Sequence, residues 1–164
     1  NIYFSIVYAR LSRELFELNS FFFDKIVEEG NNLSDYLLVL ENKVDEDKNN
    51  YHILCNNNKN NDQKKSILMF FVNIFKNNEK NFNILINILD NILDVFENNI
   101  KLENEKSNNE DLTELIFILL TNIDKFDNKY EKKIRNINQY KVKNYPGLIN
   151  KIFFKLMDIL DNYN

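Results

Sequence analysis

Tyr8-Ala9-Arg10-Leu11-Ser12-Arg13-Glu14-Leu15 is the stretch that decides the fold of this chain, because it holds the only alanine in the sequence. Alanine is the best helix former. Its small side chain also lets two helices approach closely, and this chain uses it nowhere else. The single alanine therefore indicates a packing position with little room. The alternative is that one alanine simply had to fall somewhere. Around it, apolar side chains recur at four- and three-residue steps on one helix face: Phe4, Tyr8, Leu11, Leu15 and Leu18.

The composition favours a single helical domain over residues 1–164. With 44% hydrophobic residues, the chain is long enough to bury one substantial core. It has two glycines and one proline, whereas sheet proteins use both residues at hairpin turns, so we expect helices joined by polar loops. The longest apolar run, residues 67–72, is too short to span a bilayer, and we expect no membrane partner. The lone Cys55 is typical of a reducing compartment, so we expect a cytoplasmic or nuclear location.

The periodicity of apolar residues predicts seven or eight helices, each with one dominant apolar face. We expect them at about residues 2–18, 21–29 with Ser20 as N-cap, from 35 onward, 66–77, 82–96, 112–126, 130–143 and 148–160. Two polar stretches, about 45–65 and 98–109, are predicted to be mobile loops. Short links imply antiparallel neighbours, so the fold class is all-α, a HEAT-like solenoid of stacked helix pairs, with an irregular helical bundle as the alternative.

Five groups of segments carry a resemblance to a known family through their order and spacing. They are Tyr8-Ala9-Arg10-Leu11-Ser12-Arg13-Glu14-Leu15; Gly30-Asn31-Asn32 with Leu37-Leu38 and Val44-Asp45-Glu46-Asp47; Lys64-Lys65-Ser66-Ile67 with Phe71-Val72-Asn73-Ile74-Phe75-Lys76; Asn109-Glu110-Asp111-Leu112-Thr113-Glu114-Leu115 with Leu119-Leu120-Thr121-Asn122-Ile123; and Ile152, Phe154 and Leu156 with Asp158-Ile159-Leu160-Asp161. In this order they resemble the middle domain of translation initiation factor 4G, which is built from HEAT-like helix pairs.

The resemblance implies a non-catalytic scaffold that binds a DEAD-box RNA helicase of the initiation factor 4A type, RNA, or both. Nuclear cap-binding and nonsense-mediated decay factors carry related domains. Two departures weaken the match: Val72-Asn73 replaces a glycine-glutamate pair of the family, and Phe153 stands where the family has an arginine. The opening helices of the family also have no counterpart in this chain.

No pattern of catalytic residues is visible. His52 is the only histidine and lies three residues before Cys55 in a stretch predicted to be a loop. With no second histidine or cysteine, this pair does not predict a zinc site, and a nucleophile needs a rigid partner and a shaped pocket. Gly30 and Gly147 are the only glycines, so no phosphate-binding glycine loop exists. We expect neither an enzyme nor a bound metal or cofactor.

Positive charge gathers near the C-terminal end, although the chain as a whole has a net charge of −4. Residues 129–151 carry seven cations against one carboxylate, Glu131, and we interpret them as candidate contacts for RNA or a partner: Lys129, Lys132, Lys133, Arg135, Lys141, Lys143 and Lys151. Three tyrosines, Tyr130, Tyr140 and Tyr145, are interleaved. Clustered cations with aromatic rings can follow a phosphate backbone and stack bases. The alternative is a solvated helix face of the kind that lysine-rich chains often carry.

Three functions remain open from the sequence. The first is the scaffold in translation or mRNA metabolism, and the second is a helical-repeat adaptor for protein–protein interaction that is unrelated to RNA. The third is a segment buried in a larger assembly, which the phenylalanine runs at 21–23 and 70–71 would serve. These three functions can be distinguished by which surface residues remain apolar after the helices have packed.

Overall fold

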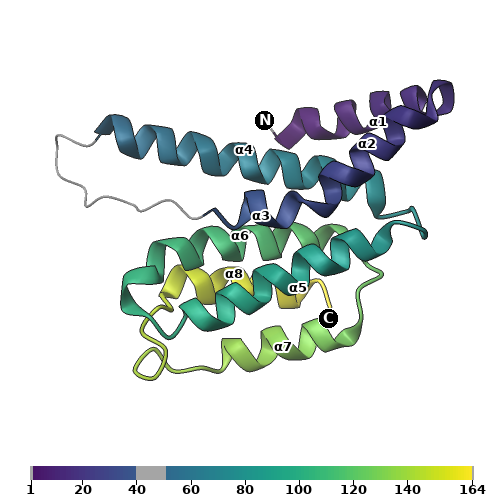
Figure 1. Cartoon of the computed structure of the whole chain (residues 1–164). Helices are drawn as coiled ribbons and strands as arrows, with labels where there is room; N and C mark the ends of the chain where they lie inside the picture. The colour runs from purple at the N-terminus through teal and green to yellow at the C-terminus, as the bar shows by residue number, and fades with distance from the viewer. Residues whose placement is uncertain (1, 40–50, 164) are drawn as a thin grey trace. The chain divides into compact units, whose positions relative to one another are not determined.

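The computed structural model describes residues 2–39 and 51–163, except for the side chains of residues 51–54. Over these residues the chain is all-α, which confirms the predicted fold class, and the described part contains no strand (Figure 1). The chain forms two compact units, Asn1–Ile88 and Leu89–Asn164, and the boundary between them falls within one helix. The single domain expected over residues 1–164 stays a prediction.

The helices follow one another along the chain with the bounds below. They are α1 (Ile2–Leu18), α2 (Ser20–Asn31), α3 (Leu33–Leu37), α4 (Tyr51–Phe75), α5 (Phe82–Asn99), a short 3-10 helix (Glu103–Glu105), α6 (Lys106–Asn122), α7 (Asn128–Asn138) and α8 (Asn150–Asp161). The first helix has the predicted bounds, whereas α7 ends five residues before the predicted end.

The polar stretch predicted as a loop over residues 45–65 is helical from Tyr51 onward, so that prediction is wrong for residues 51–65. Residues 45–50 lie outside the described residues. Asn57 and Lys64 are both buried on α4, and Lys64 Nζ donates a hydrogen bond to the carbonyl oxygen of Val39. Hydrogen bonds to buried polar groups offset the cost of removing them from water. This part of α4 is therefore stabilised by polar packing, which periodicity of apolar residues does not detect.

The second predicted loop, residues 98–109, is also largely helical, and the prediction is wrong there. The 3-10 helix covers residues 103–105, and α6 begins at Lys106, six residues before the predicted start. The side chain of Asn108 donates a 2.7 Å hydrogen bond to Glu105 Oε2 in the first turn of α6. Asn109 is fully buried and donates a 3.0 Å hydrogen bond to the carbonyl oxygen of Gly147. Local and distant polar contacts therefore extend α6 beyond its apolar residues.

The start of α2 differs from the prediction by one residue. Asn19, and not Ser20, is the N-cap, because its Oδ1 accepts a 3.0 Å hydrogen bond from the backbone N–H of Phe21. Both residue types are good N-caps, so sequence preference does not distinguish them. The next helix, α3, is predicted from residue 35 onward and ends at Leu37; residues 40–50 lie outside the described residues.

In the Asn1–Ile88 unit, α1 lies along α4 (Figure 1). Ser5 Oγ donates a 3.0 Å hydrogen bond to the carbonyl oxygen of Ser66, and Arg13 Nη2 donates a 2.9 Å hydrogen bond to that of Asn73. Because both residue numbers increase together, the two helices run in the same direction. The buried face of α1 consists of small residues: Ser5, Ala9 and Ser12. Ala9 is therefore at a tight packing position, as the sequence indicates.

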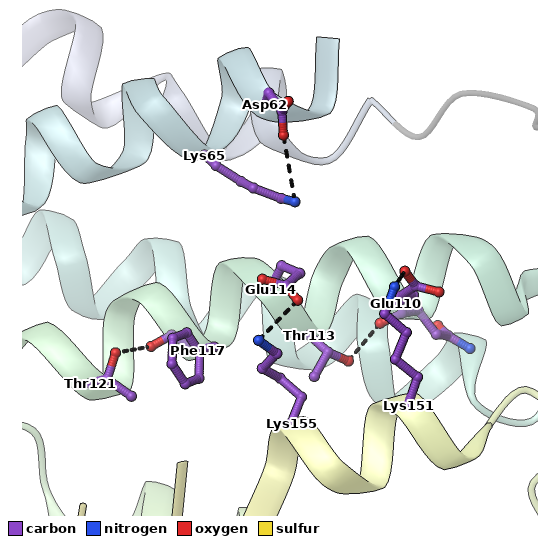
Figure 2. A network of polar contacts seen from close by, with 10 residues as sticks. Asp62, Lys65, Glu110, Thr113, Glu114, Phe117, Thr121, Lys151 and Lys155 are labelled. Carbon is purple, nitrogen blue, oxygen red and sulfur yellow. Dashed lines mark hydrogen bonds and ion pairs between the residues drawn. The ribbon is translucent and has the colours of Figure 1, made fainter. Parts of the chain in front are cut away.

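In the Leu89–Asn164 unit, alternate helices of the chain lie side by side. Figure 2 shows Lys151 and Lys155 of α8 reaching Glu110 and Glu114 of α6, the latter pair at 3.2 Å. The partners are four residues apart on both helices, so α6 and α8 run in the same direction and in register. Ion pairs also join α7 to α5, from Lys129 to Asp90 and from Lys133 to Glu97. Because both residue numbers increase together, these two helices also run in the same direction. Parallel alternate helices are what stacked antiparallel helix pairs produce.

Candidate functional site

Two residues of the predicted basic cluster are bound to carboxylates on another helix. Lys129 Nζ of α7 lies 3.8 Å from Asp90 Oδ2 of α5. One turn further along α7, Lys133 Nζ lies 3.1 Å from Glu97 Oε2. These carboxylates are more than 30 residues away in the sequence, so the local excess of positive charge is partly neutralised in the fold.

Two further cations of the cluster are also paired. Arg135 Nε donates a 2.7 Å hydrogen bond to Glu131 Oε1, four residues earlier on α7. Lys151 Nζ is paired with Glu110, which raises the pKa of Lys151, chiefly through the hydrogen bond between them. Exposed ion pairs of this kind contribute about 0–1 kcal/mol each to stability. They mainly fix where the side chains lie.

The other three residues of the cluster, Lys132, Lys141 and Lys143, are exposed and make no ion pair within the described part of the chain. Lys132 lies on α7, and the other two lie in the connection to α8. Beside them the rings of Tyr140 and Tyr145 stack on each other, with centroids 4.1 Å apart and planes at 8°. Burial, followed by the interaction with Tyr145, raises the pKa of Tyr140. Each of these rings therefore has one face already covered.

Tyr130, the third interleaved tyrosine, is a core residue with only 3% of its surface exposed. Its Oη donates a 2.8 Å hydrogen bond to Asp90 Oδ1, and Lys129 Nζ lies 4.6 Å from the centre of its ring. Burial, and then the hydrogen bond to Asp90, raise the pKa of Tyr130 well above its ordinary value of 10.0. In the sequence this ring is interleaved with the candidate cations, but in the fold it links α7 to α5.

The raised pKa of Tyr130 predicts a loss of stability at high pH. Above pH 10 the unfolded chain releases the phenolic proton while the folded protein retains it, so the stabilisation is present below pH 10 and decreases as the pH rises toward the folded pKa. Tyr130→Phe should cost about 1 kcal/mol at neutral pH and flatten the decrease above pH 10. Urea denaturation at a series of pH values measures both effects. Tyr36→Phe, at an exposed tyrosine, is the control; a Tyr130→Phe profile parallel to wild type would contradict the prediction.

From the sequence, two residues are considered for catalysis, His52 and Cys55. Cys55 is an exposed free thiol on α4, and the side chain of His52 lies outside the described residues. Within the part of the chain that the structure describes, no group of three or more histidine, cysteine or carboxylate side chains is placed to hold a metal ion. No described helix is long and apolar enough to cross a membrane.

The most unusual surface of the described chain is the apolar face of α1, which we call the α1 stripe: Phe4, Tyr8, Leu11, Leu15 and Leu18. Amphipathic helices normally bury such a face. Here it is exposed, by 57% at Phe4, 59% at Tyr8, 55% at Leu11 and 82% at Leu18, while the small-residue face packs on α4. The spacing of the stripe is visible in the sequence, but its exposure depends on which face α4 covers.

A groove of about 570 Å³ runs beside the α1 stripe, between α1 and α4. Tyr8 of the stripe lines it together with Ile67 and Phe70 of α4, and Lys59 and Asp62 lie at polar positions of the same lining. The groove thus extends the exposed apolar surface from one helix to two. Exposed apolar surface that is continuous over several residues and rimmed by polar groups is typical of protein-binding sites.

Comparison with known proteins found no matching family, no matching curated protein and no matching solved structure. The resemblance to the middle domain of initiation factor 4G therefore stays a prediction.

Proposed function

We propose that this chain is a non-catalytic helical scaffold that binds protein through the α1 stripe. The observation that carries the proposal is the exposure of Phe4, Tyr8, Leu11, Leu15 and Leu18 on a helix whose neighbouring small-residue face is fixed to α4. Burying apolar surface gives roughly 25 cal/mol per Å², so this face gains free energy when a partner covers it. Because α1 is already folded, little ordering cost opposes binding.

The finer form of the proposal is a scaffold in translation or mRNA metabolism, in the cytoplasm or nucleus. It is supported by the order and spacing of the segments that resemble the initiation factor 4G middle domain, and by the parallel alternate helices of the Leu89–Asn164 unit. Its expected partners are a DEAD-box RNA helicase of the initiation factor 4A type and RNA. A helical adaptor unrelated to RNA is the alternative.

One observation favours direct RNA contact as a second function. Lys132, Lys141 and Lys143 are exposed and have no carboxylate partner among the described residues, and two tyrosines stand next to the last two. Cations that are not ion-paired can release counterions from a phosphate backbone, and aromatic rings can stack bases. The candidate RNA contact thus contains three of the seven cations that the sequence suggests.

Affinity capture from the lysate of the source cells, with and without ribonuclease, tests the proposal. Tyr8→Glu combined with Leu11→Glu should reduce capture of protein partners at least tenfold, because two charges on the stripe must be desolvated on binding. Phe154→Glu is the matched control, since Phe154 is 64% exposed and belongs to α8, not to the stripe. Equal capture by wild type and the stripe variant would refute the α1 stripe as a binding surface. Capture of a DEAD-box helicase supports the finer form, and its loss after ribonuclease indicates that RNA bridges the two.

A further inference from the structure

The α1 stripe has the spacing of a coiled-coil seam. Its five members follow one another at steps of four, three, four and three residues, which are the a and d positions of a heptad repeat. The positions that flank the seam on one side are Ser5 and Ser12, and both are buried against α4. The seam is therefore presented outward on a helix that is anchored along its length. A partner that fits this spacing is itself an α-helix with apolar residues at heptad positions.

The exposed area of the seam reaches the lower end of the range for specific protein–protein interfaces. From their exposed fractions, the five side chains of the seam present on the order of 600 Å² of surface. Val7 is 57% exposed at the heptad position that flanks the seam on the side away from Ser5, and it adds to this area. Specific interfaces bury about 600–1,000 Å² on each partner, so the seam by itself is just large enough for one.

The seam is complementary to itself when two copies run antiparallel. Its N-terminal half carries the aromatic rings of Phe4 and Tyr8, and its C-terminal half carries Leu11 and Leu15. An antiparallel two-fold pairing sets Phe4 against Leu15 of the second copy and Tyr8 against Leu11, so that each of these four layers combines one aromatic ring with one leucine, while Leu18 lies beyond the paired layers. A parallel pairing would oppose ring to ring at one end and leucine to leucine at the other, with unequal layers that pack less uniformly.

We propose that the α1 stripe binds a second copy of this chain, as an antiparallel two-helix pair with two-fold symmetry. This rests on the proposed function, that the stripe is a protein-binding surface, and names its occupant. A two-fold axis makes the same patch serve both partners, which is the commonest way in which soluble proteins form dimers. The scaffold then presents two copies of the Leu89–Asn164 unit to other partners.

Light scattering coupled to size-exclusion chromatography tests the proposal on the whole 164-residue chain. The mass should be twice 19.7 kDa at about 100 µM protein. Tyr8→Glu with Leu11→Glu should give the monomer mass with an unchanged helical circular dichroism spectrum, while Phe154→Glu should remain a dimer. A monomer mass for the wild-type chain at this concentration overturns the proposal, and so does a dimer mass for the folded stripe variant.

Disulfide cross-linking tests the direction of the pair. With Cys55 replaced by serine in both chains, a Phe4→Cys copy mixed with a Leu15→Cys copy should form a disulfide-linked dimer on mild oxidation, and Phe4→Cys alone should not. Cross-linking of Phe4→Cys with itself overturns the antiparallel pairing.

The capture experiment separates failure of the dimer from failure of the proposed function. Suppose that the wild-type chain is monomeric but that the stripe variant captures less protein than the wild-type chain. The stripe then binds a different protein, and only the proposal that it binds a second copy is refuted. If neither mass nor capture depends on the stripe, both proposals fail.

Discussion

Gly147→Ala is expected to lower the free energy of unfolding of the Leu89–Asn164 unit by about 3 kcal/mol. A Cβ atom at this position would lie 2.7 Å from three atoms: the carbonyl oxygens of Asn99 and Leu102 and the Nδ2 of Asn109. Two of the three are backbone atoms, so they cannot rotate away from the new methyl group. None of the described glycines has a positive φ, so crowding, and not backbone strain, is the cause.

The crowded site is also a hydrogen-bonded junction, which increases the effect. The Gly147 N–H donates a 2.9 Å hydrogen bond to the carbonyl oxygen of Ile100, and its own carbonyl accepts one from Asn109 Nδ2. Asn109 Oδ1 is buried and has no hydrogen-bond partner, so this junction already carries one uncompensated polar atom. Moving the backbone to make room for a methyl group would weaken both remaining bonds.

Urea denaturation, with hydrogen exchange of α6 and α8 to localise the effect, measures the cost of Gly147→Ala. Gly30→Ala is the matched control, because its Cβ would approach only side-chain carbons, 2.8 Å from Cε2 of Phe75 and 3.3 Å from Cε1 of Phe71. These rings can shift by a few tenths of an ångström, and we expect a cost of about 1 kcal/mol. An equal or larger cost at Gly30 would contradict the backbone-crowding argument.

Ala9→Leu is expected to destabilise the Asn1–Ile88 unit by about 3 kcal/mol. Ala9 is fully buried, and the flanking residues of the same face, Ser5 and Ser12, are nearly so. Ser5 holds α1 close to α4 through its hydrogen bond to the Ser66 carbonyl oxygen, so the helices cannot separate to admit a larger side chain without breaking it. The added volume must therefore break that bond or force an unfavourable rotamer.

Chemical denaturation of Ala9→Leu and of Arg10→Leu measures this effect. Arg10 is the next residue on α1 and is exposed, so a leucine there adds the same side chain without entering the α1–α4 contact. We expect the free energy of unfolding of Arg10→Leu to stay within about 0.5 kcal/mol of wild type. If Ala9→Leu also stayed within that range, α1 would not pack on α4 through its small residues.

Strongly periodic apolar segments could be predicted from the sequence, and polar helical segments could not. The bounds of α1 were predicted because seventeen residues repeat one pattern without interruption. The first half of α4 was not, because its buried positions include Asn57 and Lys64, which hydropathy assigns to solvent. The sequence also could not predict which face of α1 is buried, because apolar periodicity identifies a face but does not show which element covers it.

The basic cluster shows the same limit in electrostatic terms. Its cations could be read from the sequence, but Asp90, Glu97 and Glu110, which neutralise three of them, are distant in the chain and come close only in the fold. Tyr130 is indistinguishable in sequence from Tyr140 and Tyr145, yet only Tyr130 is in the core.

The paired charges between α6 and α8 favour one lengthwise alignment of these two helices over others. If the pairing of α8 with α6 shifted by one helical turn so that Lys155 met Glu110, both Lys151 and Glu114 would lose their partners, and only one of the two contacts would remain. A shift of the pairing by one or two residues would place other residues than the lysines opposite Glu110 and Glu114, since only positions three or four apart share a helix face. Each pair adds little stability by itself, but the repeat distinguishes the correct alignment from its nearest neighbours.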